Sequence, residues 1–291
     1  WLPLGGYVKI AGMIDESMDK EQIKKPPQPW EFRSKKAWQR LLIMTGGVLV
    51  NFILALAIFA MILFAFGREY IPVQNLNNGV VWDSLALKHG LQNGDKVIKI
   101  GGQEISDFSE ISKQIVTETP ETITVIRDGR QQEVSLPDDF VQQMIANDVK
   151  TLAMPAFPFI IDSVMPDMPA EEAGFKKGDK IVEVNGTKTE YAMTIIQKIQ
   201  QNKGKKIDMK VLRHQDTTAL TVEVAEKGVI GIYNKPFDYY IDFAKEEYGF
   251  VESIPAGISL GVNTLVGYVK QMKHVFTKEG AQSIGGFGTI G

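Results

Sequence analysis

Only a few side chains in this sequence could carry out chemistry, and none has the spacing of a catalytic site. The chain of 291 residues has no cysteine, which leaves neither a thiol nucleophile nor a cysteine-bound metal. Its three histidines are His89, His214 and His274, and none lies in a His-Glu-x-x-His sequence, the helical motif that holds catalytic zinc. We therefore expect no catalytic residue and no metal ligand within this sequence.

Three further patterns are similar to catalytic or binding motifs but fit structural roles better. The acidic pair Asp138-Asp139 follows Pro137 and is typical of a solvated loop. Residues 286–291 spell G-x-G-x-x-G, yet no strand-forming run precedes them, so a dinucleotide site is not expected. His274 stands close to two lysines and without a partner ligand, which indicates a boundary between membrane and water.

The overall composition limits the classes of function. A net charge of -3 and a pI near 5.8, without a long basic face, argue against nucleic-acid binding. Hydrophobic residues make up 44% of the chain and charged residues 23%, as is usual for folded protein. Any membrane signal is therefore confined to part of the chain.

The strongest membrane signal is an uncharged apolar stretch at residues 41–66. It contains no Asp, Glu, Lys, Arg or His, and a helix of this length is about 39 Å long, enough to cross a bilayer. A buried helix of a large soluble core is the alternative, but such helices rarely run so long without a charge. Four basic residues between positions 33 and 40 place the preceding flank in the cytoplasm, so the chain beyond Gly67 is expected across the membrane. Residues 30–67 thus form a basic flank and a transmembrane helix.

An internal repeat lies beyond the helix. Residues 90–102 read GLQNGDKVIKIGG and residues 174–186 read GFKKGDKIVEVNG, so the two segments align without a gap at an offset of 84 residues. Each is followed by a helical pattern and then by two strand patterns. The strand patterns lie at 122–127, 131–136, 206–213 and 217–224. The sequence predicts two copies of one small α+β module, at residues 70–154 and 155–233.

The dipeptides Gly94-Asp95 and Gly178-Asp179 occupy the same turn in the two copies. Each leads into an apolar strand, and Asp accepts backbone hydrogen bonds in such a turn. We therefore predict that both aspartates fix turns rather than take part in catalysis.

The remaining segments connect these parts or return to the membrane. Residues 1–29 begin with a glycine turn that leads into a hairpin associated with the membrane, and continue as a polar, proline-rich connection. Residues 234–252 are expected to be a linker whose aromatic side chains lie either at the membrane interface or in a core. Residues 253–291 contain a second, weaker membrane helix with small residues, followed by the start of a glycine-rich turn. The predicted fold class is a membrane protein with α-helical transmembrane segments and two α+β domains in tandem.

In this order the parts resemble the bacterial site-2 protease family. The resemblance rests on GGYVKI at residues 5–10, on Gly46, Gly47, Asn51 and Phe52 in the apolar helix, and on the repeated segment, which is similar to the signature of PDZ domains. The sequence departs from the family at Gly47, where proline is usual, which puts the local bend of the helix in doubt. Neither end of the sequence has the character of a natural terminus, so we expect a central fragment of a longer protein.

The resemblance implies an intramembrane zinc metalloprotease that performs regulated cleavage of single-span membrane proteins. In the family, zinc is held by a His-Glu-x-x-His segment upstream and a Leu-Asp-Gly segment downstream, so this fragment alone would be inactive. The implied substrate is an anti-sigma-factor-like membrane protein. The implied location is the bacterial inner (cytoplasmic) membrane, with the PDZ-like domains on the periplasmic side.

The resemblance also implies residues that contact substrate. Gly5, Gly6, Tyr7, Val8 and Lys9 would form a strand edge that holds an extended substrate by main-chain hydrogen bonds. Asn51, a lone amide in the apolar helix, would bind substrate or, equally well, a neighbouring helix.

The PDZ-like modules imply peptide binding by strand addition, with loop amides taking a terminal carboxylate. In the second module the candidates are Gly228, Val229, Ile230, Gly231 and Ile232, and in the first the nearest residues by position are 150–154. Alternatively, the modules filter substrates by size and bind no carboxylate. A membrane-tethered tandem-PDZ adaptor without proteolytic activity is the alternative function from another class.

Overall fold

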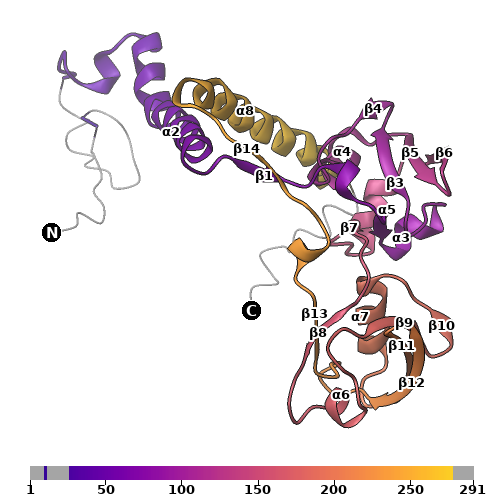
Figure 1. Ribbon diagram of the computed structural model, residues 1–291. Coiled ribbons are helices and arrows are strands. Elements are labelled where there is room, and N and C mark those ends of the chain that lie inside the picture. Colours follow the sequence, from indigo (N-terminus) through magenta and orange to yellow (C-terminus); the bar gives the residue numbers. More distant parts are fainter. Residues whose placement is uncertain (1–9, 12–25, 278–291) are drawn as a thin grey trace. The chain divides into compact units, whose positions relative to one another are not determined.

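The computed structural model describes residues 10–11 and 26–277 of the chain (Figure 1). The chain divides into two units, Trp1–Phe66 with Tyr248–Asn263 and Gly67–Glu247 with Thr264–Gly291. The boundary falls within the last helix, so each unit contains one half of it.

The first unit is built from apolar helices. The short 3-10 turn η1 (Phe32–Ser34) leads into α2 (Ala37–Phe66), whose large hydrophobic side chains are mostly exposed. Helix α2 begins four residues before the predicted stretch because the side chain of Gln39 accepts a hydrogen bond from the amide of Lys36 and caps the start. A helix that is apolar on all sides and not covered by protein suits lipid rather than water. Both α2 and α8 (Phe250–Val275) are long and apolar enough to cross a membrane.

The first half of α8 packs antiparallel against α2 through small residues. A Cβ atom at Gly257 would collide with the backbone of Ala60, and one at Gly261 would collide with another α2 side chain. The rings of Phe64 and Phe250 meet edge to face with their centroids 5.7 Å apart. The glycines therefore permit the close helix approach that is typical of packing inside a bilayer.

The second unit contains two modules with the same topology. Module 1 comprises η2 (Val73–Asn75), β2 (Val80–Trp82), α3 (Ser84–Lys88), β3 (Lys96–Ile100), β4 (Gln103–Glu104), α4 (Ser109–Glu118), β5 (Thr122–Arg127), β6 (Arg130–Ser135), α5 (Phe140–Ala146) and β7 (Ala153–Pro155). Module 2 comprises β8 (Ile161–Val164), α6 (Pro169–Glu172), β9 (Lys180–Val184), β10 (Thr187–Lys188), α7 (Ala192–Gln201), β11 (Lys206–Arg213), β12 (Asp216–Glu223) and β13 (Ile232–Asn234).

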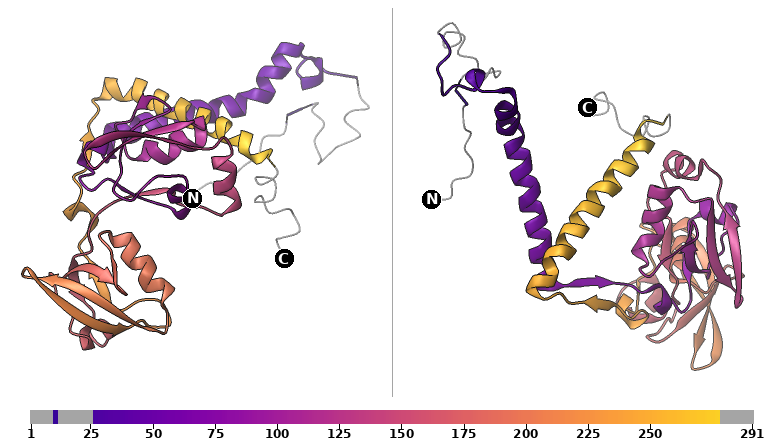
Figure 2. Two further views of the ribbon diagram at one scale, coloured as in Figure 1. Left: turned by 90° about the vertical axis from the view of Figure 1, so that its right-hand side faces the viewer. Right: turned by 90° about the horizontal axis from the view of Figure 1, so that it is seen from above.

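Each module has one four-stranded antiparallel sheet and one two-stranded ladder. The sheets have the orders β4-β3-β5-β6 and β10-β9-β11-β12, and the ladders join β2 to β7 and β8 to β13. Strands β11 and β12 form a long hairpin that Figure 2 shows clearly. The four predicted strand patterns correspond to β5, β6, β11 and β12, with their ends within one residue of the prediction.

Each module has its own hydrophobic core beneath its main helix. Ile111 and Ile115 of α4 are fully buried in module 1, and Ile195 and Ile199 of α7 are buried in module 2. These pairs are four residues apart and therefore lie on one face of each helix. The repeat in the sequence is thus a repeat of core positions.

The two chain segments that connect the modules to the helices run side by side. Strand β1 (Arg68–Tyr70) pairs antiparallel with β14 (Ala244–Glu246), as Figures 1 and 2 show. Between module 2 and β14 lie the 3-10 turn η3 (Phe237–Tyr239) and Tyr240, whose ring stacks on Phe157 at 5.0 Å. Part of the segment 234–252 is therefore a folded connection, and its aromatic side chains pack against the core of module 1.

Candidate functional site

Module 2 contains an open apolar groove of about 730 Å³. One wall is α7, where Ile196 and Gln200 lie next to the core stripe of the helix. Met165 and Met168 also line the groove, as do the residues of the loop before β13. A groove between a helix and a strand, lined by apolar side chains, suits an extended peptide.

The five predicted residues Gly228, Val229, Ile230, Gly231 and Ile232 all line this groove. The carbonyl oxygens of Val229, Ile230 and Gly231 accept hydrogen bonds from the amides of Ala225, Ala170 and Met165 at 3.0, 2.9 and 2.8 Å. The amides of the same three loop residues donate no hydrogen bond to any other residue that the structure describes. Unpaired amides grouped in one loop form a site for an anion such as a terminal carboxylate.

Two glycines give this loop its shape. Gly228 has φ +76° and Gly231 has φ +89°, values that L side chains rarely adopt. A Cβ atom at Gly231 would also overlap the side chain of Met168. The side chain of Lys203 lies against Gly228 and brings a positive charge close to the loop.

The strand beside the groove has an edge available for pairing. Strand β13 pairs with β8 in a two-stranded ladder, and no third strand pairs with it among the residues that the structure describes. Tyr240 holds the end of this ladder, because its hydroxyl donates to Asn234 Oδ1 at 2.8 Å and accepts from the Ile160 amide at 3.3 Å. Burial raises the pKa of Tyr240 to about 12, so the hydroxyl keeps its proton at neutral pH.

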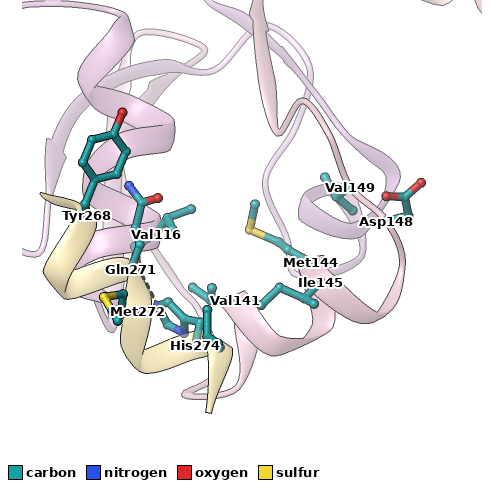
Figure 3. Close-up of a pocket in the computed structure, with 11 residues that line it drawn as sticks. Val116, Val141, Met144, Ile145, Asp148, Val149, Tyr268, Gln271, Met272 and His274 are labelled. Carbon is teal, nitrogen blue, oxygen red and sulfur yellow. Dashed lines mark hydrogen bonds between the residues drawn. The ribbon is translucent and has the colours of Figure 1, made fainter. Parts of the chain in front are cut away.

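Module 1 differs at the corresponding place. Helix α5 stands where module 2 has its short loop, and residues 150–154 run into β7, which pairs with β2. Here α5 and the last turns of α8 border a pocket of about 570 Å³ (Figure 3). Met144 and Ile145 line it from α5, and Tyr268 lines it from α8. The two modules therefore share a topology but not a groove.

Of the other predicted contact residues, the structure describes only Asn51. Asn51 lies on α2, and its exposed side chain forms no hydrogen bond with another described residue, so the amide remains available to a neighbouring helix or a substrate. Gly5, Gly6, Tyr7, Val8 and Lys9 lie outside the described residues.

The described part of the chain does not offer a metal site. It contains no group of three or more His, Asp or Glu side chains placed to hold a metal ion. The ring of His89 bonds to Gln143 Oε1 at 3.0 Å, and the ring of His274 bonds to the carbonyl oxygen of Val116 at 2.9 Å. His274 is thus buried against module 1 and has a partner there, while its position at a membrane boundary stays a prediction.

Sequence reasoning missed the groove walls. Met165, Met168 and Tyr233 line the groove, and no pattern in the sequence singled them out. Ile196 had a usable signal, since it is an apolar residue directly beside the core positions of α7 and is only partly buried against that core. An apolar residue at that position predicts a second contact surface on the helix.

Comparisons with known proteins identify similar chains. Peptidase family M50 matches residues 1–290. The regulator of sigma-E protease RseP of Escherichia coli is 27% identical over 233 residues, covering 76% of this chain and 50% of the relative. The regulator of sigma E protease of Haemophilus influenzae is 26% identical over 276 residues, covering 88% and 59%. A candidate zinc metalloprotease of Rickettsia conorii is 34% identical over 132 residues, covering 45% and 36%.

The chain therefore spans between about a third and three fifths of the length of these relatives. Among solved structures, the PDZ domain of an SdrC-like protein from Listeria innocua is 26% identical. That similarity covers 27% of this chain and 94% of the other, with a TM-score of 0.25.

Proposed function

The chain belongs to peptidase family M50, the site-2 protease family, and from this membership we propose that it is part of an intramembrane zinc metalloprotease that cleaves single-span membrane proteins. The single observation that carries the proposal is the family match over residues 1–290. Relatives named as regulators of sigma-E support a substrate that resembles an anti-sigma factor. The two long apolar helices are consistent with a site inside the membrane.

The proposal places the zinc ligands outside the residues that the structure describes. No group of described His, Asp and Glu side chains fits the three or four ligands that zinc requires. In the proposal, the described residues of this chain therefore take no part in peptide hydrolysis. Its own contribution is to hold the membrane helices and to select the substrates that reach the catalytic site.

The modules supply that selection in the proposal. We assign both modules as PDZ-like domains, which belong on the periplasmic side of the bacterial inner membrane because they follow the C-terminal end of α2 in the sequence. Four basic residues flank the opposite end of α2, which supports this orientation. Module 2 binds the free carboxyl end of a peptide in its groove, and a substrate whose periplasmic domain is still attached is held back by its size.

Proteolysis of a defined substrate tests the proposal. The whole protein is reconstituted in liposomes with a single-span anti-sigma factor, either intact or shortened on its periplasmic side. We expect cleavage of the shortened substrate, loss of cleavage when a zinc chelator is added, and recovery when zinc is returned. Absence of cleavage in every zinc-containing sample would contradict the protease function.

The open groove of module 2 favours one second candidate, a membrane-tethered adaptor that binds peptides without cutting them. The same liposomes separate the two functions. An adaptor would retain the shortened substrate on the vesicles uncut, whereas a protease would release two fragments.

A further inference from the structure

The last turns of α8 lie on the end of α4 in module 1. Lys270 Nζ is 2.6 Å from Glu118 Oε1, and Lys273 Nζ donates to the carbonyl oxygen of Thr117 at 3.2 Å. The ring nitrogen Nε2 of His274 is 2.9 Å from the carbonyl oxygen of Val116. Three successive residues of α4 are therefore each contacted by a different cationic or imidazole side chain of α8.

These contacts satisfy groups that a helix end leaves unpaired. The last carbonyl oxygens of a helix have no partner within it and carry partial negative charge. Helix α4 ends at Glu118, before Thr119 with its left-handed backbone angles, so the carbonyls of Val116 and Thr117 lie in the last turn, where partners within the helix are missing. A carbonyl oxygen only accepts, so His274 must donate through Nε2. The Lys270 ammonium holds the pKa of the Glu118 carboxyl below its ordinary value by a hydrogen bond, as expected for an attractive contact.

The contact lies where module 2 has its open groove. Val116 of α4 aligns with Gln200 of α7 in the repeat, and Gln200 lines the groove of module 2. In module 1 the corresponding space lies between α5 and α8, and Figure 3 shows side chains from both helices around it. His274 is only 5% exposed there, so α8 covers this end of α4 closely.

We propose that the last two turns of α8 form an intramolecular latch that closes module 1. While Lys270, Lys273 and His274 are docked on α4, module 1 accepts no extended peptide and only module 2 offers a groove. Release of α8 opens module 1. The latch does not depend on proteolysis and goes beyond the proposed function.

The latch has a consequence for membrane topology. A helix that crosses the bilayer from Phe250 places residue 270 about 30 Å away, on the far side of the hydrocarbon core. Module 1 lies between the two helices in sequence and stays on the near side. The docked position of Lys270 and a complete crossing by α8 therefore exclude each other.

Zero-length cross-linking of the whole protein in native membranes tests the contact. A carbodiimide activates the Glu118 carboxyl, and attack by the Lys270 amine forms an amide bond and releases the urea by-product. We expect mass spectrometry to identify a link between the peptides that contain Glu118 and Lys270, and we expect E118Q to lose this link. The double variant E118K/K270E, in which the carboxyl and the amine exchange places, should form the link again. Both positions are half exposed, so these variants should fold. Absence of the link in the native chain, or its persistence in E118Q, would overturn the latch.

Cysteine labelling tests the side of the membrane independently. The sequence has no cysteine, so V269C, E133C and S34C each give one reactive thiol in this part of the protein. With a membrane-impermeant maleimide, V269C should react from the same side as E133C in module 1. Reaction of V269C only from the side of S34C would show that α8 crosses the membrane and would overturn the proposal.

Discussion

Arg213 donates two hydrogen bonds to the carboxylate of Asp179, from Nε and Nη2 at 2.7 Å each. Asp179 is fully buried and also accepts from the amide of Lys176 at 2.9 Å, which fixes the turn. Arg127 and Asp95 form the same bidentate pair at 2.7 Å in module 1. Each arginine additionally donates to the carbonyl oxygen of the glycine that opens the repeated segment. The shared shape of the two modules thus includes a buried ion pair.

Removal of one arginine should destabilise its module strongly. R213M leaves a buried carboxylate without its partner, and such a loss costs about 3–5 kcal/mol. K210M is the matched control, because Lys210 pairs with Glu183 near the surface, where a pair contributes about 0–1 kcal/mol. Hydrogen exchange of the β9 and β11 amides in urea measures the stability of module 2 in both variants. Equal protection in R213M and K210M would contradict a structural role for the pair.

The same pair should make module 2 sensitive to acid. Burial alone would raise the pKa of Asp179, but the hydrogen bonds from Arg213 and Lys176 outweigh it, and the pKa lies below its ordinary value. The resulting stability is fully present above about pH 4, the pKa of an unfolded Asp, and is lost as the pH falls toward the lowered value. D179N should be less stable than the unchanged protein at pH 7, and its free energy of unfolding should fall less when the pH is lowered. Urea midpoints of both proteins, measured from pH 7 down to pH 2, report this difference. If the midpoints of the two proteins fell in parallel, the result would contradict a role of Asp179 in the acid sensitivity.

The turn glycines should tolerate alanine unequally. Gly94 has φ +96° and Gly178 has φ +89°, so a side chain at either position costs about 1–2 kcal/mol of backbone strain. A Cβ atom at Gly178 meets open space, whereas one at Gly94 would lie 2.5 Å from the hydroxyl of Tyr191. G94A should therefore lower the thermal midpoint more than G178A does. When Y191F is also present, the difference in thermal midpoint between G94A and G178A should become smaller. An unchanged difference would refute the role of the hydroxyl.

Peptide binding to module 2 should require the free carboxylate and the loop shape. A peptide with a free C-terminus should bind more tightly than its amidated form, because the charged carboxylate accepts stronger hydrogen bonds from the loop amides than a neutral carboxamide does. G231A should abolish binding by displacing Met168, while G186A, in a turn away from the groove with open space for a Cβ atom, should retain it. Fluorescence anisotropy measures both. Equal affinity for the two peptides would favour a size filter without carboxylate recognition.

The packing of α2 and α8 should depend on one glycine face. A methyl group at Gly257 would collide with the Ala60 backbone, whereas one at Gly267 meets nothing within 4 Å. G257A should lower the thermal stability in detergent, and G267A should be neutral or raise it by about 0.5–1 kcal/mol through better helix propensity. Similar melting of the two variants would show that the helices do not pack through Gly257.

The sequence by itself determined the features that depend on neighbouring residues. An uncharged run at 41–66 identified the long apolar helix α2, and the repeated GDK segments located two modules and four of their strands. The positive φ values of Gly94 and Gly178 agree with the turns predicted there. The position of residues 228–232 after the last strand of the repeat also followed from the order along the chain, and these residues line the groove, while their role in peptide binding stays a prediction.

Only the tertiary structure decided which distant groups meet. Arg213 lies 34 residues from Asp179, and the two come together because β9 pairs antiparallel with β11. The methionines of the groove and the contact of His274 with Val116 likewise depend on segments folded beside each other. Hydrophobic period and turn chemistry act over a few residues, whereas a buried carboxylate or a free helix end takes its partner from whatever the fold brings near.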